Sequence, residues 1–221
     1  MAKVDVLLGL QWGDEGKGKV VDFLTPKYDV VARFQGGPNA GHTLEFDGKK
    51  HVLHQIPSGI FREGTINIIG NGVVLDPITF ENELTDLAPF HLDLKRSLIL
   101  SSKAQMIIPT HRLLDAAFEK SKGVLKIGST LRGIGPTYQD KMARVGLRLG
   151  DVNSKDFDQK YLSLRRKHCE TLDRLGFEYD LKEQEHTFFK TIEILRSFSI
   201  LDTEYVINDL IDQGKTVLAE G

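Results

Sequence analysis

The chain has 221 residues, 40% of them hydrophobic, which is enough to form a folded domain with a sizeable apolar core. Its 29 Lys and Arg residues nearly balance its 31 Asp and Glu residues, which argues against a broad basic surface for nucleic acids and against an acidic tail. The single cysteine, Cys169, excludes a disulfide within this chain and a multi-cysteine zinc site, and no apolar run approaches the ~18 residues that span a bilayer. We expect a cytosolic protein with neither nucleic-acid nor membrane partners.

The first elements predicted along the chain are two strands that each end in a glycine-rich loop. The apolar run 3–9 predicts a buried strand, and "GKVVDFL" after the loop has helical spacing. A second strand begins near Tyr28 and leads into "GGPNAGHT". The alternating stretch "TLEFDGKKHVLHQ" predicts a β-hairpin that turns at Asp47 and Gly48.

The rest of the chain alternates at first between strands and helices. Segments 65–70 and 97–102 predict short buried strands, whereas 77–87 and 109–121 predict helices. This alternation is typical of an α/β fold with a mostly parallel sheet, here with a P-loop-like phosphate loop and a β-hairpin. From about 153 to 212 the pattern changes to charged amphipathic helices, which predicts a helical subdomain with few strand signals.

The last residues predict one more strand. Gly214 is placed to end a helix, and "TVLAEG" follows as an apolar strand. Since functional loops follow the carboxyl ends of such strands, we expect another functional loop beyond residue 221. We therefore expect one larger catalytic domain of which this chain is the N-terminal part: an α/β portion (1–150) with the active-site loops, a helical layer (151–213), and a strand (214–221) that leads into a missing loop.

The first glycine loop departs from the usual P-loop, G-x-x-x-x-G-K-[ST]. Gly9 and Gly16 enclose six residues instead of four, and Gly18 replaces the hydroxyl residue that binds magnesium. A carboxylate beside a polyphosphate is repelled unless it has a compensating role. Asp14 would have one if it coordinated Mg²⁺, or if it took a proton from a second substrate. The alternative is a solvated Gly/Asp turn that joins a strand to a helix.

Two further segments carry candidate binding groups. The second loop offers the side chains of Gln35, Asn39, His42 and Thr43, and a histidine there can donate to a phosphoryl oxygen in a transition state. Segment 126–151 combines glycines and hydroxyl groups with basic side chains that include Arg132, Lys141, Arg144 and Arg148, a combination that suits a phosphomonoester. The alternatives are a structural histidine, and a flexible loop followed by a solvated basic helix that opens near Pro136.

Together, "QWGDEGKGK", "QGGPNAGHT" and "GSTLRGIGPTYQDKMARVGLR" closely resemble the adenylosuccinate synthetases, enzymes that join IMP and L-aspartate at the expense of GTP. The resemblance implies a GTP-dependent carbon–nitrogen ligase of AMP biosynthesis. In this chemistry a base removes the N1 proton of IMP and the purine carbonyl oxygen attacks the γ-phosphate of GTP. The amine of aspartate then displaces the phosphate.

The resemblance also implies a role for each matched residue. Asp14 would be the catalytic base and His42 the acid, with Lys17 and Gln35 in the catalytic group, while Asp14 and the carbonyl of Gly41 would bind Mg²⁺. The implied GTP-binding positions are Gly13, Asp14, Glu15, Gly16, Lys17, Gly18, Lys19, Gly41, His42 and Thr43. The implied IMP-binding positions are Asp14, Glu15, Gly16, Lys17, Asn39, Ala40, Gly41, His42, Thr130 and Arg144.

The resemblance further implies a homodimer, in which Arg144 reaches the IMP site of the neighbouring subunit. Chains of this family continue well beyond residue 221, with segments that select guanine and hold aspartate, so we expect this chain alone to be inactive. Two rival hypotheses are another phosphotransferase or carbon–nitrogen ligase on a similar scaffold, and a nucleotide-binding switch without catalysis. A simple kinase would not need both "QWGDEGKGK" and "NAGHT", whereas GTP binding without IMP-dependent chemistry in the full-length protein would favour the switch.

Overall fold

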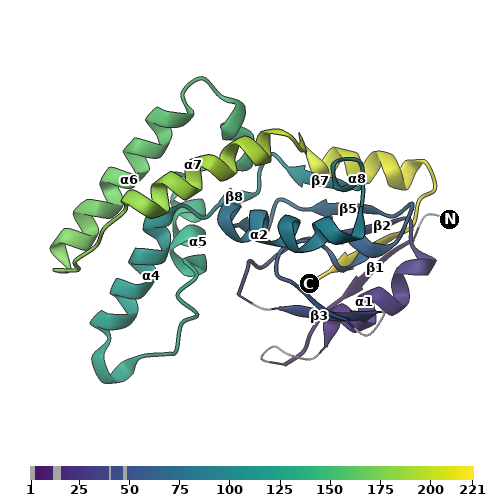
Figure 1. Cartoon of the computed structure of the whole chain (residues 1–221), viewed down its shortest axis with the longest axis horizontal. Helices are drawn as coiled ribbons and strands as arrows, with labels where there is room; N and C mark the ends of the chain where they lie inside the picture. The colour runs from purple at the N-terminus through teal and green to yellow at the C-terminus, as the bar shows by residue number, and fades with distance from the viewer. Residues whose placement is uncertain (1–2, 12–15, 40, 47–48) are drawn as a thin grey trace.

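The computed structural model describes residues 3–11, 16–39, 41–46 and 49–221, and for 42–46 and 49–51 it describes the backbone alone. It has a part built on a parallel sheet and a part built of helices, joined by a continuous core (Figure 1). This confirms the predicted α/β fold with a mostly parallel sheet, a hairpin and a helical portion. In the described part of the chain, no helix is both long enough and apolar enough to cross a bilayer.

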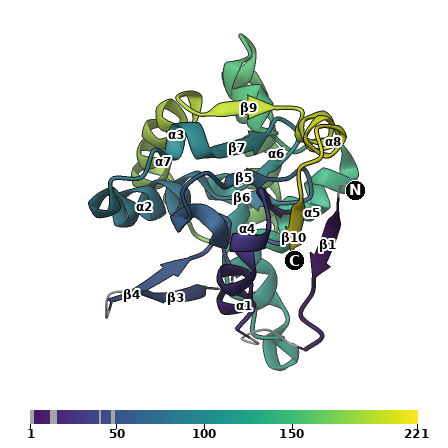
Figure 2. The same cartoon turned by 90° about the vertical axis from the view of Figure 1, so that its right-hand side faces the viewer.

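The main sheet has six parallel strands, and its last strand in sequence lies between the first two. In spatial order they are β1 (Val4–Leu7), β10 (Val217–Glu220), β2 (Val30–Arg33), β5 (Ile66–Ile69), β7 (Leu98–Ser101) and β9 (Ser199–Leu201). Figure 2 shows β1 and β9 at the two ends of this order. Two smaller pairs are the antiparallel hairpin β3 (His42–Phe46) with β4 (Lys49–Leu53), and the parallel pair β6 (Val74–Leu75) with β8 (Gln105–Met106).

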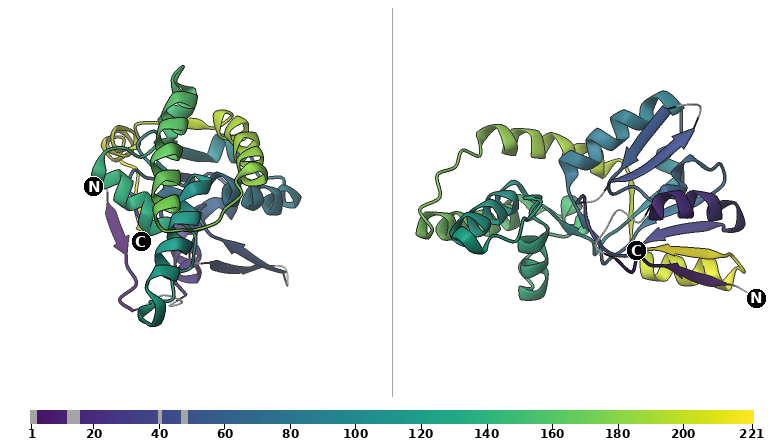
Figure 3. Two further views of the ribbon diagram at one scale, coloured as in Figure 1. Left: turned by 90° about the vertical axis from the view of Figure 1, so that its left-hand side faces the viewer. Right: turned by 90° about the horizontal axis from the view of Figure 1, so that it is seen from below.

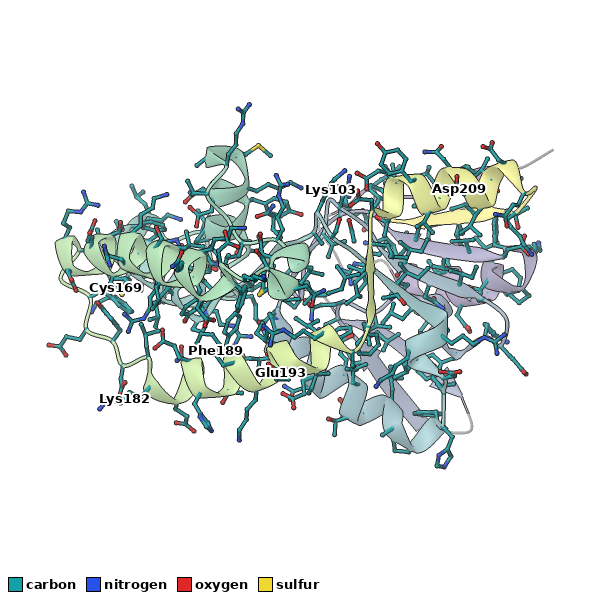
Figure 4. The ribbon with its side chains drawn as sticks, turned by 90° about the horizontal axis from the view of Figure 1, so that it is seen from above. Lys103, Cys169, Lys182, Phe189, Glu193 and Asp209 are labelled. Carbon is teal, nitrogen blue, oxygen red and sulfur yellow. The ribbon has the colours of Figure 1, made fainter. Side chains whose placement is uncertain are left out.

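The helices divide between the two parts of the molecule. They are α1 (Lys17–Leu24), α2 (Pro77–Leu87), α3 (Leu94–Ser97), α4 (Pro109–Ser121), α5 (Ile134–Ala143), α6 (Phe157–Arg174), α7 (Lys182–Arg196) and α8 (Thr203–Asp212). Helices α4, α5 and α6 gather away from the sheet, and α7 runs from that far end back toward α2 (Figure 3). Figure 4 places Cys169 and Lys182 at that far end, and Asp209 on α8 over the sheet.

Alternating side chains of the central strands pack against different helices. Val30 and Val217 pack with α8, whereas Val31 and Leu218 pack with Val21 of α1. All four residues of β2 are buried, as expected for a parallel strand covered on both faces. The sheet is therefore covered by a helix on each face at β10 and at β2, the strand that carries the second glycine loop.

The prediction of a buried first strand was wrong. Strand β1 lies at the edge of the sheet, and the side chains of Val4 and Val6 are 49% and 57% exposed. An apolar run indicates a strand but does not say whether a helix covers both of its faces. Strand β9 was not indicated either, because three residues between two amphipathic helices give no clear strand pattern.

Candidate active site

Both glycine loops leave the same edge of the sheet. Parallel pairing places Leu7, Glu220 and Arg33 side by side at the carboxyl ends of β1, β10 and β2. The N–H of Gly221 donates to the carbonyl of Leu7 at 3.0 Å, and the N–H of Phe34 donates to that of Glu220 at 3.3 Å. The two loops therefore begin on either side of Gly221, at the edge where parallel sheets bind ligands.

The first loop is described on both sides of residues 12–15, so the predicted roles of Gly13, Asp14 and Glu15 lie outside the described residues. The described flanks line a hollow of about 410 Å³ that includes Gly9, Gln11 and the half-buried Lys17. The first loop ends at Gly16, whose φ of +76° favours glycine, and α1 begins immediately afterwards. Backbone N–H groups at the start of α1 suit an anion.

Within α1, two further predicted GTP-binding residues are described. Gly18 is buried and Lys19 is exposed. The structure thus brings Gly16, Lys17, Gly18 and Lys19 together at the first turn of one helix.

The second loop is bound by a buried arginine, Arg33, which the sequence patterns did not indicate. Arg33 is only 5% exposed; its Nη2 donates to the carbonyl of Gly37 at 3.1 Å, and its Nη1 donates to the carbonyl of His54. Above it, Gln35 and Asn39 are exposed, as binding groups need to be, whereas Ala40 lies outside the described residues. An arginine at the end of a strand usually lies at the protein surface, which is why the burial of Arg33 was not predicted.

The second loop ends in a close contact with the hairpin. A Cβ atom on Gly41 would lie 2.6 Å from Cγ1 of Val52, so only glycine fits without a shift. His42 and Thr43 then open β3, where they pair with Leu53 and Val52. The backbone of both residues is thereby placed beside the loop, while their side chains lie outside the described part.

Two buried carboxylates bind the segment 55–58, which follows the hairpin. Glu220 accepts hydrogen bonds from the backbone N–H and the hydroxyl of Ser58, at 3.0 and 2.7 Å. Glu83 accepts the N–H groups of Gln55 and Ile56 at 2.9 and 3.0 Å. Burial raises the pKa of Glu83 to about 7, although these N–H groups and Arg33 act to lower it.

The third predicted segment is fixed by two acids of α4. Asp115 accepts the hydroxyl of Ser129 at 2.6 Å and the N–H of Gly133 at 2.9 Å, and Glu119 accepts the N–H of Gly128 at 2.6 Å. Thr130 is exposed within this anchored loop. A threonine predicted to bind IMP is thus presented by a loop with a defined backbone.

Helix α5 then connects the third segment to the second loop and to Arg144. The hydroxyl of Tyr138 contacts Gly36, and a Cβ on Gly37 would meet Ile134 at 3.2 Å. Arg144 follows the helix with a φ of +60° and is exposed. It lines a separate hollow of about 310 Å³ that also includes Lys141, Arg148, Lys160 and Asp151.

A buried cluster joins α5 to its neighbours. Asp140 accepts hydrogen bonds from Nε2 of His111 at 3.0 Å and Nε2 of His168 at 2.7 Å. The Nδ1 atom of His111 accepts the N–H of Ile108 at 3.0 Å, and Nδ1 of His168 pairs with the hydroxyl of Thr110 at 2.6 Å. Two histidines and a carboxylate are possible metal ligands, and their ligand atoms lie within 4.8 Å of one another. These partners assign a proton to the Nε2 atom of each histidine. Every imidazole nitrogen of the cluster therefore has a hydrogen-bond partner, and the cluster joins α4, α5 and α6.

Comparison with known proteins identifies one family. A family model described as adenylosuccinate synthetase matches residues 6–221. The adenylosuccinate synthetase of Flavobacterium psychrophilum is 60% identical over 220 residues, which cover 99% of this chain and 52% of that protein. That of Cytophaga hutchinsonii is 61% identical over 220 residues, covering 99% and 51%.

A solved structure agrees with these matches. The structure titled as fully ligated adenylosuccinate synthetase from Plasmodium falciparum has a TM-score of 0.86 and 36% identity, and the match covers 100% of this chain and 51% of that one. The chain therefore spans about half the length of the relatives that it matches. By the family model and these relatives, the chain belongs to the adenylosuccinate synthetase family.

Proposed function

We propose that the full-length protein joins IMP and L-aspartate to give adenylosuccinate, with GTP as the phosphoryl donor. Family membership supports the reaction, and one observation of the structure supports its location: the two glycine loops leave the same edge of the sheet on either side of β10. We further propose that this chain is part of a longer catalytic unit that acts in the cytosol as a homodimer.

In the proposed reaction, the carboxylate of Asp14 takes the N1 proton of IMP, and the purine carbonyl oxygen attacks the γ-phosphorus of GTP so that GDP leaves. The amine of aspartate then forms the new carbon–nitrogen bond and phosphate leaves. His42 would donate a hydrogen bond to the transferring phosphoryl group, and Lys17 with the first turn of α1 would hold the phosphates. Gln35, which is exposed on the second loop, would lie near the reaction centre.

The proposed magnesium site uses the carboxylate of Asp14 and the backbone carbonyl of Gly41. Both are hard oxygen ligands of the kind that Mg²⁺ prefers, so the donor set fits the ion. When bound, the ion would neutralise phosphate charge during transfer. Asn39 and Thr130 would bind IMP, and Arg144, at the far end of α5, would reach the IMP of the other subunit.

Phosphate release from GTP by the full-length protein tests this function. We expect release to require Mg²⁺, IMP and aspartate together, and Asp14→Asn to lower turnover by at least ~10²-fold, since Asn cannot take the proton. Asp22→Asn on α1 is a matched control, because Asp22 pairs with Arg62 at the surface and turnover should remain within about twofold. Binding of GTP without IMP-dependent release would instead favour a nucleotide-binding switch.

A further inference from the structure

The hydroxyl group of Tyr138 lies where two loops meet. It donates to the carbonyl of Gly72 at 2.8 Å and accepts the N–H of Gly36 at 3.2 Å. Gly36 belongs to the second glycine loop after β2, and Gly72 belongs to the turn after β5. One side-chain hydroxyl therefore joins the backbone at the carboxyl ends of two neighbouring strands.

The two glycines at this junction have little room to move. A Cβ on Gly72 would lie 2.1 Å from the carbonyl oxygen of Phe34, so the turn packs directly against the backbone that leads into the second loop. Gly36 has a φ of +84°, and its carbonyl accepts the N–H of Val74 at 2.9 Å. The start of the loop is thus held between fixed strands and the hydroxyl of Tyr138.

Helix α5 gives Tyr138 a rigid base. Two residues further along, Asp140 is fixed by the buried imidazoles of α4 and α6. One turn after Tyr138, Nζ of Lys141 donates to the carbonyl of Asn71 at 3.2 Å, in the same turn as Gly72. The position of the hydroxyl is therefore set by the helical part of the molecule and not by the loop that it contacts.

We propose that Tyr138 is a positioning residue for the ligation reaction: through Gly36 it sets where loop 36–41 presents Asn39 and the backbone of Gly41. This proposal rests on the proposed function, which assigns Asn39 to IMP and Gly41 to magnesium. Without the hydroxyl, the N–H of Gly36 loses its partner and the loop can settle elsewhere. A displacement of ~1 Å in a positioned group can cost up to ~10²-fold in rate.

Tyr138→Phe in the full-length protein removes only the hydroxyl, and Tyr161→Phe is its matched control. Tyr161 is 1% exposed on α6 and donates to Oε1 of Glu185 at 2.7 Å, in the helical part. We expect both variants to lower the thermal midpoint by a similar amount, because Tyr138→Phe loses two hydrogen bonds to neutral backbone groups and Tyr161→Phe loses one stronger hydrogen bond to a carboxylate. Only Tyr138→Phe should lower kcat at saturating substrates. We expect a decrease of about tenfold, which is smaller than the ~10²-fold that a displacement of ~1 Å can cost. Equal kcat values in the two variants would overturn the proposal.

Two further measurements separate this inference from the proposed function. Hydrogen exchange of peptides covering residues 34–41, without substrates, should be faster in Tyr138→Phe and unchanged in Tyr161→Phe, whatever reaction the protein performs. If wild type shows no IMP-dependent release, the proposed function fails, while the exchange still decides whether Tyr138 holds the loop.

In an Asn39→Ala background, the tenfold kcat penalty of Tyr138→Phe should shrink below about threefold, because a positioned group is already absent. A full tenfold penalty there, or unchanged exchange, would contradict the role.

Discussion

Replacing Asp140 by asparagine should loosen the joint between α4, α5 and α6. The carboxylate accepts two imidazole N–H groups on Oδ2, and Lys167 lies 3.3 Å from Oδ1. Although burial acts to raise it, the hydrogen bonds from His111 and His168 hold the pKa of Asp140 far below its usual value, so the charged form is the one in the fold. Asparagine keeps the shape of the side chain and removes that charge.

The size of the effect follows from the two imidazole hydrogen bonds. Hydrogen bonds to a charged group contribute ~1.5–3 kcal/mol each and neutral ones ~0.5–1.5, so each bond should lose roughly 1–1.5 kcal/mol. Lys167 is half exposed and adds little. We therefore expect the free energy of local opening to fall by about 2–3 kcal/mol, which is a roughly 30- to 150-fold loss of protection against hydrogen exchange.

Native-state hydrogen exchange of the full-length protein at pH 7.5 measures this change in peptides from α4, α5 and α6. Asp173→Asn is the control, because Asp173 accepts the hydroxyl of Tyr179 at 3.1 Å on the exposed surface of α6. Its effect should stay below about 0.5 kcal/mol. If the two variants lose protection equally, the buried cluster does not hold the three helices together.

Three other predictions concern pH and IMP. Burial lowers the pKa of His111 to about 4, so on acidification the unfolded state binds a proton at a higher pH than the folded state does. The protection of α4 against hydrogen exchange should therefore fall as the pH decreases from about 6.5 to 4, by up to roughly 3 kcal/mol. The buried Glu83, with its pKa raised to about 7, has the opposite sign: its contribution is favourable below about 4.5 and is lost toward pH 7, so protection of α2 should rise on acidification relative to α4. Exchange corrected for intrinsic rates at several pH values checks both, and equal slopes would refute them. Arg144→Leu should raise the KM for IMP about tenfold or more, the loss of a charged phosphate contact, with little change in folding, whereas Arg166→Leu on exposed α6 should leave it unchanged; unaltered IMP saturation would remove Arg144 from the IMP site.

Local sequence patterns predicted the elements that depend on local chemistry. Helix α2 begins at Pro77, where the carboxylate of Asp76 caps the N–H of Ile78 at 3.0 Å, and Gly214 ends α8 with a φ of +82°. The glycine loops were placed correctly after strands because apolar runs precede both. The specific roles of Asn39 and Arg144 came from resemblance and are still proposals.

The features that the sequence did not predict depend on contacts between distant residues. His111, Asp140 and His168 lie on three helices, and no spacing in the chain indicates that they meet. The burial of Arg33 depends in part on its hydrogen bond to the carbonyl of His54, which lies 21 residues further along the chain. The exposure of Val6 likewise depends on which strand lies at the edge of the finished sheet.

The order of strands has a consequence for how the protein is made. Val4, near the start of the chain, pairs with Val217, near the end of the residues described, and β10 also separates β1 from β2. During synthesis the two glycine loops emerge early, but their spacing is fixed only when β10 inserts between them. Contacts this far apart in sequence form late and slowly. Until β10 inserts, the edge that gathers the two loops is incomplete, so the proposed nucleotide binding should begin only after β10 has left the ribosome.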